Sequence, residues 1–495
     1  MDILNADIAE IKSALENKSL SSKELVSFYL KRIREYDVKT DAFLAINNNA
    51  LMEAETIDNK RARNEELPAF AGIPVAVKDN IATMGLPTTC ASKILENYTS
   101  VYDATVVNLL KEAGFIIIGK LNMDEFAMGS SCENSAFKVT KNPWNLSKVT
   151  GGSSGGSAAA TASRLTPVSL GSDTGGSIRQ PASLCGVVGL KPTYGRISRY
   201  GLVAFASSLD QIGPITKNVS DAATLLTILG KHDCKDSTSA NVEAKNYTKL
   251  LNPNIKGYKI GIAHEYFGEG LSSDIRDAIE KSVKTLESSG AEIIEISLPH
   301  TGYAIPVYYI IATAEASSNL ARYDGVKYGF REPSVNLEEM YSKTRSTGFG
   351  PEVKRRIMLG TYVLSAGYYD AYYIKAQKVR TLIRQDFINA FEKVDIILTP
   401  TSPFTAFNIG EKVENPLHMY LCDVYTIPLN LFGGCGLSIP AGFDKHGLPV
   451  GLQLMGNHFE EEKILNCAYA FQQCTDFHKR IPQGFALIPE EKNGI

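Results

Sequence analysis

Residues 150–181 read TGGSSGGSAAATASRLTPVSLGSDTGGSIRQP and contain two glycine-serine turns, at 151–156 and 174–177. Glycine lets the backbone approach a ligand closely, so such turns can direct several N–H groups at one point. A serine after two glycines then lies beside donors suited to a developing oxyanion. Many glycine-serine runs are flexible linkers. Here an alanine-rich segment and an apolar run at 168–170 separate the turns, which indicates a nucleophilic site inside an ordered domain.

Segments on both sides of this stretch predict strands that alternate with helices. Residues 72–77 form a short apolar run that ends at Lys78. The order strand, helix, strand is expected again over 258–262, 274–289 and 293–296. Such alternation is typical of an α/β fold, in which a mixed, twisted β-sheet is covered by helices on both faces.

No change in composition divides the chain, although its length would suggest about three domains at ~100–200 residues each. We therefore expect one domain, 1–495. Residues 1–66 should form helices that pack on it, one of them opened by a capping box of Ser21 and Glu24. Residues 231–254 are polar and rich in serine, threonine and asparagine, which indicates a surface loop or insertion.

The composition is that of a soluble globular enzyme, with 44% apolar and 21% charged residues and a net charge of −3. The absence of a basic surplus argues against nucleic-acid binding by this chain alone. Its eight cysteines include no C-x-x-C pair, which argues against a zinc site or a disulfide framework. The first residues do not resemble a signal peptide, and no apolar run approaches the ~18 residues of a membrane span. We expect a cytoplasmic protein without a bound metal.

Two familiar motifs compete with this interpretation. Residues 114–121 (GFIIIGKL) approach the phosphate-binding loop, but the final Ser/Thr is missing and the intervening residues favour a core strand. Residues 151–155 match G-x-S-x-G, the nucleophile elbow of α/β-hydrolases, which follows a strand and needs a histidine. Residues 142–145 look like a turn instead, and the seven histidines lie mostly in polar, loop-like surroundings. A Ser–His mechanism is therefore disfavoured.

Without histidine, the serine nucleophile needs another base. A lysine can serve if burial lowers its pKa from ~10.4 towards neutrality, because desolvation disfavours the charged form. Most lysines are solvated surface groups. Lys78 directly follows the apolar run IPVAV, which favours its burial.

Three motifs together resemble the amidase signature family: residues 72–79, the GGSSGG turn at 151–156 and DTGGSIRQP at 173–181. They occur in the family's order and at similar separations, and the resemblance continues over nearly the whole chain. It implies a single α/β domain with a Ser–cis-Ser–Lys triad.

The resemblance assigns roles residue by residue. It implies that Ser177 is the nucleophile, Ser153 a bridging serine on a cis peptide, and Lys78 the base. The backbone N–H groups of Gly175, Gly176 and Ser177 would then stabilise the oxyanion.

Four further segments, 120–130, 315–320, 348–356 and 422–428, resemble one branch of that family, the glutamine-hydrolysing subunits of tRNA-dependent amidotransferases. By this likeness Arg356 would hold the α-carboxylate of glutamine. Without the likeness, Arg356 would be read as an ordinary helix surface residue beside two other basic side chains.

The same likeness implies that Asp423 holds the α-amino group of glutamine. A free amino acid needs one fixed positive and one fixed negative partner, and arginine binds carboxylates bidentately. The other residues expected at the pocket are Gly129, Ser130, Tyr308 and Tyr309.

The resemblance further implies partners. Ammonia from glutamine would pass to a complex with B and C subunits, where ATP and Mg²⁺ serve the conversion of Glu-tRNA(Gln), or also Asp-tRNA(Asn), with the tRNA held mainly by the partner. No cofactor is expected in this chain. One alternative is a stand-alone amidase for small apolar or aryl amides, which would not need Arg356 and Asp423. A non-catalytic scaffold or tRNA-binding module is the other, and the intact triad motifs argue against it.

Overall fold

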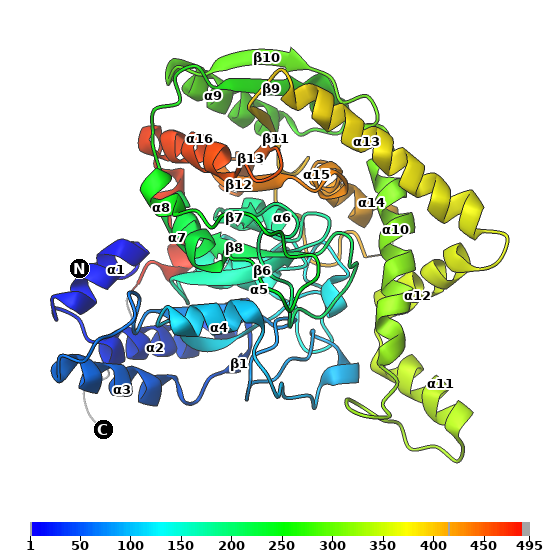
Figure 1. Cartoon of the computed structure of the whole chain (residues 1–495), viewed down its shortest axis with the longest axis horizontal. Coiled ribbons are helices and arrows are strands. Elements are labelled where there is room, and N and C mark those ends of the chain that lie inside the picture. The colour runs from blue at the N-terminus through cyan, green and yellow to red at the C-terminus, as the bar shows by residue number, and fades with distance from the viewer. Residues whose placement is uncertain (1, 414–415, 488–495) are drawn as a thin grey trace.

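A computed structural model describes residues 2–413 and 416–487. Its centre is an eleven-stranded sheet in the order β1-β3-β2-β6-β8-β7-β12-β13-β11-β9-β10, beside a small β4-β5 hairpin (Figure 1). The strands are β1 (Phe43–Ile46), β2 (Pro74–Lys78), β3 (Ile116–Leu121), β4 (Lys141–Asn142), β5 (Asn145–Val149), β6 (Val168–Asp173), β7 (Val188–Lys191), β8 (Gln211–Thr216), β9 (Lys259–Ala263), β10 (Glu292–Ile296), β11 (Ile396–Pro400), β12 (Cys435–Phe443) and β13 (Pro449–Gly456).

The helices lie around this sheet and confirm the predicted α/β class. They are α1 (Ile8–Glu16), α2 (Ser22–Thr40), α3 (Ala50–Ala62), α4 (Thr105–Glu112), α5 (Gly155–Ala162), α6 (Arg179–Cys185), α7 (Val219–Leu229), α8 (Tyr247–Leu250), α9 (Ser273–Ser288), α10 (Ala304–Asn319), α11 (Leu337–Gly348), α12 (Pro351–Leu364), α13 (Lys375–Phe391), α14 (Pro416–Tyr420), α15 (Ile427–Phe432) and α16 (Glu461–Cys474). Among the described residues, no helix is both long and apolar enough to cross a membrane.

The sheet separates two hydrophobic cores, because successive side chains of a strand point to opposite faces. On β11, Ile396 and Leu398 enter the core that includes α7, α9 and α16, whereas Ile397 enters the core formed with α10, α13 and α15. On β13, Leu454 and Met455 divide in the same way. Strands of this kind are buried on both faces, which explains their continuous apolar sequences.

Pairing within the sheet is mixed, as predicted. β2 is parallel to both β3 and β6, and β9 is parallel to β10 and β11. The pairs β6–β8, β7–β8, β7–β12, β12–β13, β11–β13 and β1–β3 are antiparallel. The GFIIIGKL segment contributes the fully buried strand β3, which confirms its interpretation as core.

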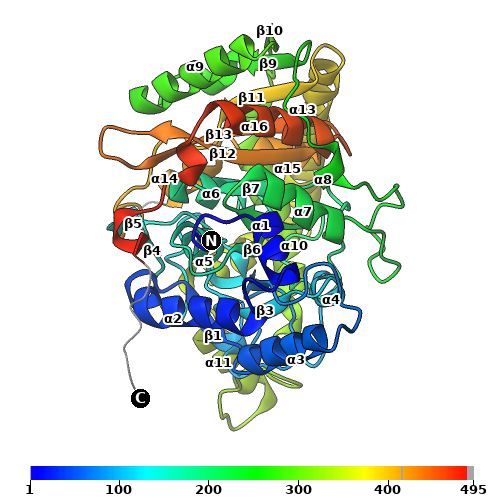
Figure 2. The same ribbon diagram turned by 90° about the vertical axis from the view of Figure 1, so that its left-hand side faces the viewer.

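The N-terminal helices cover one end of the sheet (Figure 2). The predicted capping box is present at α2, where Ser21 accepts from the N–H of Glu24. Arg32 of α2 is fully buried and donates to the carbonyls of Ser163 and Arg164, just beyond α5. The region also contains the edge strand β1, which the sequence did not predict.

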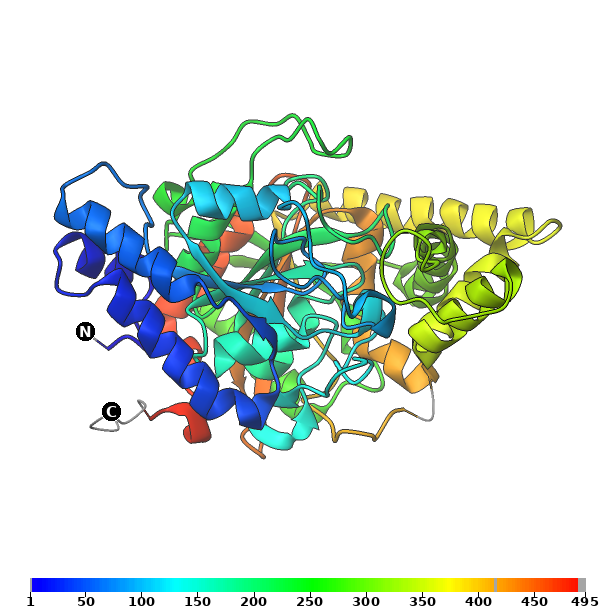
Figure 3. The same ribbon diagram turned by 90° about the horizontal axis from the view of Figure 1, so that it is seen from below.

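Helices α10 to α13 lie together on one side of the sheet (Figures 1 and 3). The helical segment before β11 begins as a π-helical turn, Tyr369–Ile374, and continues as α13. The polar segment predicted at 231–254 contains no helix or strand until the short α8, whose Tyr247 is buried.

Candidate active site

The candidate site lies where two parallel strands end. β2 ends at Lys78, and its neighbour β6 ends at Asp173 and leads into the turn at 174–177. Because the strands run in the same direction, both ends reach the same edge of the sheet. The first glycine-serine turn lies between β5 and α5 and leads into α5 at Gly155.

The ammonium of Lys78 is fully buried among hydroxyl groups. Its Nζ lies 2.7 Å from Oγ of Ser153, 2.9 Å from Oγ of Ser154 and 3.0 Å from Oγ of Ser172. The peptide between Gly152 and Ser153 is cis. The structure therefore places the predicted base directly against the predicted bridging serine.

The other contacts of these serines orient the amine. Ser154 Oγ donates to the carbonyl of Ser172 at 3.1 Å, so it accepts from Lys78. Ser172 Oγ accepts from Lys78 and from the amide of Asn80. Two N–H bonds of the amine are thus directed at Ser154 and Ser172. The third position, a lone pair in the neutral amine, is directed at Ser153.

Burial also favours the neutral form of the Lys78 amine. Loss of water around Lys78 lowers its pKa to about 7, although the charge of Asp124 acts in the opposite direction. At pH 8 most of the lysine is then uncharged and can accept the proton of Ser153.

Ser177 lies beside this group and keeps 8% of its surface exposed. Its carbonyl accepts from the N–H of Ser154 at 3.1 Å, which ties the two glycine-serine turns together. The carboxylate of Asp173 accepts from the N–H of Gly176 at 2.9 Å and of Ile178 at 3.1 Å. The N–H of Gly176 therefore holds the turn in this structure. The predicted oxyanion roles of the Gly175, Gly176 and Ser177 N–H groups stay predictions.

A buried ion pair fixes that turn. Arg179 donates to both carboxylate oxygens of Asp173 at 3.1 Å and also to Asn430 and Gln453. Burial alone would raise the pKa of Asp173, but Arg179 outweighs it and lowers the pKa to about 2. The turn that carries Ser177 is therefore held by a permanent charge with satisfied hydrogen bonds.

The first turn has a brace of its own. Gln180 accepts from the N–H of Gly152 at 3.0 Å and donates to the carbonyl of Ser130 at 2.9 Å. The N–H of Asp124 donates to the carbonyl of Ser153 at 3.2 Å. A Cβ on Gly152 would lie 2.0 Å from the carboxylate of Asp124, so only glycine fits there.

Asp423 ends a short helical turn, Leu421–Asp423, that precedes α15. Its carboxylate accepts from Ser130 Oγ at 2.5 Å, and burial raises its pKa to about 7 although this hydrogen bond favours the anion. Its other oxygen, Oδ1, is buried without a hydrogen-bond partner. The carbonyls of Asp423 and Gly175 both accept from Thr426 Oγ1, at 3.1 and 2.7 Å. Asp423 is thereby linked directly to the nucleophile turn.

Arg356 of α12 is 3% exposed, which excludes an ordinary surface residue. Its guanidinium lies 5.2 Å from the ring centre of Tyr309 and 5.7 Å from that of Tyr420, and its Nε donates to Glu352 at 2.8 Å. Arg356 also lines a pocket of about 150 Å³. It is therefore a buried cation at the edge of a cavity.

The remaining predicted pocket residues lie close to these charges and the turn. A Cβ on Gly175 would lie 2.8 Å from the ring of Tyr308, so that ring covers the nucleophile turn. Tyr308 meets Tyr309 edge-on at 5.1 Å. Gly129 lines the pocket beside Arg356 and contacts the carboxylate of Asp124 closely.

Sequence reasoning missed several members of the site. Ser154 lies in the quoted GGSSGG turn and Ser172 directly precedes Asp173, so both could have been found from the motifs.

Two of the histidines form hydrogen bonds outside the site: His300 pairs with Asp386, and His458 with the carbonyl of Phe432. Throughout 2–413 and 416–487, no group of three or more histidine, cysteine, aspartate or glutamate residues could hold a metal ion.

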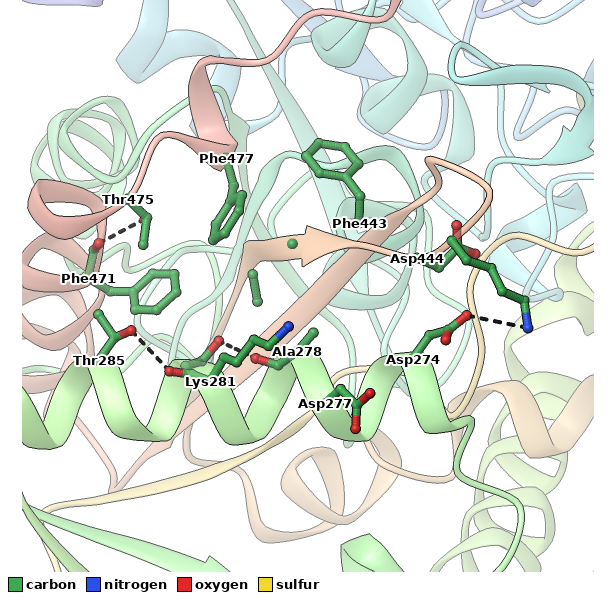
Figure 4. Close-up of a pocket in the computed structure, with 14 residues that line it drawn as sticks. Asp274, Asp277, Ala278, Lys281, Thr285, Phe443, Asp444, Phe471, Thr475 and Phe477 are labelled. Carbon is green, nitrogen blue, oxygen red and sulfur yellow. Dashed lines mark hydrogen bonds and ion pairs between the residues drawn. The ribbon is translucent and has the colours of Figure 1, made fainter.

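A larger hollow, of about 340 Å³, lies away from this chemistry. Its walls come from α9, the end of β12 and the end of α16, and include Phe443, Phe471 and Phe477 (Figure 4). Asp274 and Lys445 form an ion pair at its rim, 3.9 Å apart. None of the triad residues lines it, so this hollow is separate from the candidate active site.

Comparisons with known proteins agree with the geometry. Residues 24–465 match the family model described as Amidase. The A subunit of glutamyl-tRNA(Gln) amidotransferase from Persephonella marina is 58% identical over 98% of this chain and 100% of its own length. The crystal structure of the A subunit of glutamyl-tRNA(Gln) amidotransferase from Thermotoga maritima is 46% identical, with a TM-score of 0.79, and the match covers 96% of this chain and 95% of that one.

The peptide amidase of Stenotrophomonas maltophilia shares the fold, with a TM-score of 0.80 over 97% of this chain and 99% of that one, but only 29% sequence identity. The family model and the long, highly identical relatives together show that the chain belongs to the amidase signature family.

Proposed function

We propose that the chain is the glutamine-hydrolysing subunit of a tRNA-dependent amidotransferase. The observation that carries this function is the pair of buried opposite charges, Arg356 and Asp423. Both are close enough to influence the pKa of Tyr308, the ring that covers the Ser177 turn. Burying a charge is costly unless it finds a partner. The α-carboxylate and α-ammonium of a free amino acid supply such partners, and an apolar amide would supply neither.

The existing contacts leave room for both substrate charges. Glu352 accepts from Nε of Arg356 and also from Tyr420, and it forms an ion pair with Arg355. Its single negative charge is therefore shared between two guanidinium groups. Asp423 has only a serine hydroxyl on one oxygen, and its other oxygen is free for the ammonium group of the substrate.

The first half of the reaction acylates the enzyme. Ser177 Oγ attacks the side-chain amide carbon of glutamine while its proton passes to Ser153 Oγ, and the proton of Ser153 passes to the neutral amine of Lys78. The backbone N–H groups of Gly175 and Ser177 stabilise the oxyanion. Collapse of the tetrahedral intermediate breaks the C–N bond, and the relayed proton returns to the leaving group as ammonia forms.

The second half releases glutamate. Water attacks the γ-glutamyl ester on Ser177, and the same relay takes a proton from the water and returns it to Ser177. Lys78 thus serves as base and then as acid in each half.

Ammonia then passes to a partner. The names of the relatives support a role in glutamyl-tRNA(Gln) amidation. We propose a cytoplasmic heterotrimer with B and C subunits in which the partner holds the tRNA, on Glu-tRNA(Gln) or also Asp-tRNA(Asn). ATP and Mg²⁺ would serve the partner's reaction, and this chain itself would need no cofactor.

A Ser177→Ala variant tests this division of labour in the assembled complex. The change removes one oxygen atom, so folding and assembly should persist. Amidation of Glu-tRNA(Gln) with glutamine as donor should cease, whereas concentrated ammonium chloride should restore it, because the acceptor site is intact. Retained glutamine-dependent activity would remove Ser177 from its role. Failure of ammonium rescue in an intact complex would contradict the role as an ammonia supplier.

A further inference from the structure

Two adjacent residues, Asp124 and Glu125, contact both halves of the proposed glutamine site. The N–H of Asp124 donates to the carbonyl of Ser153, as described above. The carboxylate of Glu125 accepts from the N–H of Gly350 at 2.9 and 3.1 Å through its two oxygens. Gly350 directly precedes α12, the helix that carries Arg356. One short segment therefore joins the serine relay to the carboxylate-binding helix.

The contact at the start of α12 is tightly packed. Glu125 is 2% exposed, and Ser92 Oγ also donates to its carboxylate. A Cβ on Gly350 would lie 2.3 Å from Oε2 of Glu125, so only glycine allows this approach. Next to it, the rings of Phe126 and Phe349 meet edge-on at 5.7 Å. An anion at a helix N-terminus is also favoured by the helix dipole.

Arg356 lies within two turns of this contact, at ~1.5 Å of helix per residue. A shift of the N-terminus of α12 therefore moves the guanidinium relative to Ser177. The C-terminal half of α12 packs on α10, where a Cβ on Gly360 would lie 1.9 Å from the carbonyl of Thr313. The docked N-terminus adds the restraint on the side of the serine relay, so both contacts together set the distance between the cation and the nucleophile.

We propose that Glu125 is a positioning residue that fixes Arg356 at the distance from Ser177 that suits a γ-carboxamide with an α-carboxylate. This inference rests on the proposed function. Glu125 contributes to selectivity for glutamine through α12 and does not touch the reacting atoms. An ordinary stabilising role would affect all amide substrates alike, whereas this role affects those that Arg356 binds.

The test compares three amides in the full-length chain, purified together with the proteins that assemble with it. Glutamine carries both charges, glutaramic acid lacks the α-amino group, and 4-aminobutanamide lacks the α-carboxylate. Burial raises the pKa of Glu125 to about 7, so assays at pH 8 keep it mostly ionised. Kinetic constants are measured for each amide by ammonia release.

Glu125→Gln should lower kcat/KM for glutamine and glutaramic acid by about tenfold, mainly through KM, because misplaced binding groups cost this much or more. The value for 4-aminobutanamide should stay within about twofold, a change within the scatter expected of surface substitutions. Gly350→Ala, which acts on the other side of the same contact, should give the same pattern. The double variant should be no worse than the poorer single one, since both changes break one contact. Glu339→Gln, which removes an exposed ion pair with Lys343 on α11, should change none of the three.

Equal losses on all three amides, or no loss, would overturn the proposal for Glu125. The Arg356→Ala variant separates this failure from failure of the proposed function. If Arg356→Ala discriminates among the amides and Glu125→Gln does not, only the positioning role fails. If Arg356→Ala affects the three amides equally, Arg356 does not bind the substrate carboxylate, and the proposed function fails with it.

Discussion

Lys78 and Lys120 lie on the neighbouring strands β2 and β3, and both are fully buried. Lys120 Nζ lies 3.4 Å from the carboxylate of Asp79 and donates to the carbonyls of Ile81 and Pro87 at 2.8 and 3.0 Å. Lys78 has three serine hydroxyls as its nearest partners instead. The same residue type at the same depth thus meets an anion in one case and neutral hydroxyls in the other.

This difference distinguishes the proposed catalytic lysine, Lys78, from the structural lysine, Lys120. Burial lowers the pKa of both lysines, and a carboxylate opposes this in each case, Asp124 for Lys78 and Asp79 for Lys120. Only Asp79 forms a direct ion pair with its lysine, at 3.4 Å. Hydroxyl groups stabilise the charge less and can carry protons. Burial alone therefore does not make a lysine a base, because the groups in contact with the amine determine whether it is held in the charged form.

The largest expected effect is the loss of catalysis on changing Lys78. Lys78→Met should reduce glutamine hydrolysis by about 10³-fold or more, since general-base catalysis contributes ~10²–10⁴-fold and the relay has no second base. Initial rates of ammonia release would measure this, with thermal unfolding as a control for folding. Near-normal turnover would show that Lys78 and Lys120 do not differ in the proposed way.

The second prediction compares the stability of the same two positions, where the change at Lys120 should cost more than the change at Lys78. Lys120→Met leaves the buried carboxylate of Asp79 without its cation, and removing one partner of a buried pair costs about 3–5 kcal/mol. Lys78→Met leaves only hydroxyls with unused hydrogen bonds, at about 1–2 kcal/mol. Urea unfolding of the two variants at pH 8 gives both values. A larger loss for Lys78→Met would contradict the assignment of the structural role to Lys120.

The proximity of the residues in the candidate site was largely predictable because they follow local patterns. The apolar run before Lys78 predicts burial, and burial gives the lowered pKa. The turns that carry Ser153 and Ser177 are visible as glycine-serine repeats. The apolar strands β3, β9 and β11 were predictable for the same reason, since strands buried on both faces have continuous apolar sequences.

The rest depends on contacts between distant segments. The commitment of the Gly176 N–H to Asp173 follows from how the turn folds around a buried ion pair, which no spacing reveals. Glu125 meets Gly350 across 225 positions of sequence, and both are ordinary in their local context. The edge strand β1, only four residues long, lies between helices and has too short a pattern to detect.

The smallest expected effect is a pH dependence, and it must distinguish Lys78 from Asp423 and Glu125, because the pKa of each is about 7. The profiles are therefore measured in the Glu125→Gln background, which removes one of the three ionisations. A base must be uncharged, so kcat/KM should fall as the pH drops below 7, approaching tenfold per unit. Glutaramic acid is the suitable substrate, since it lacks the ammonium group that Asp423 is proposed to bind. Lys120, held by its carboxylate, should not contribute to the profile.

The Asp423→Asn variant assigns the ionisation. With glutaramic acid its pH profile should still bend near 7, because Lys78 is unchanged. With glutamine the variant should be weaker at every pH, as it lacks the anion for the α-ammonium group. If the bend disappears in Asp423→Asn, the ionisation belongs to Asp423. Lys78 would then not be the group whose ionisation limits the reaction, and its contrast with Lys120 would fail.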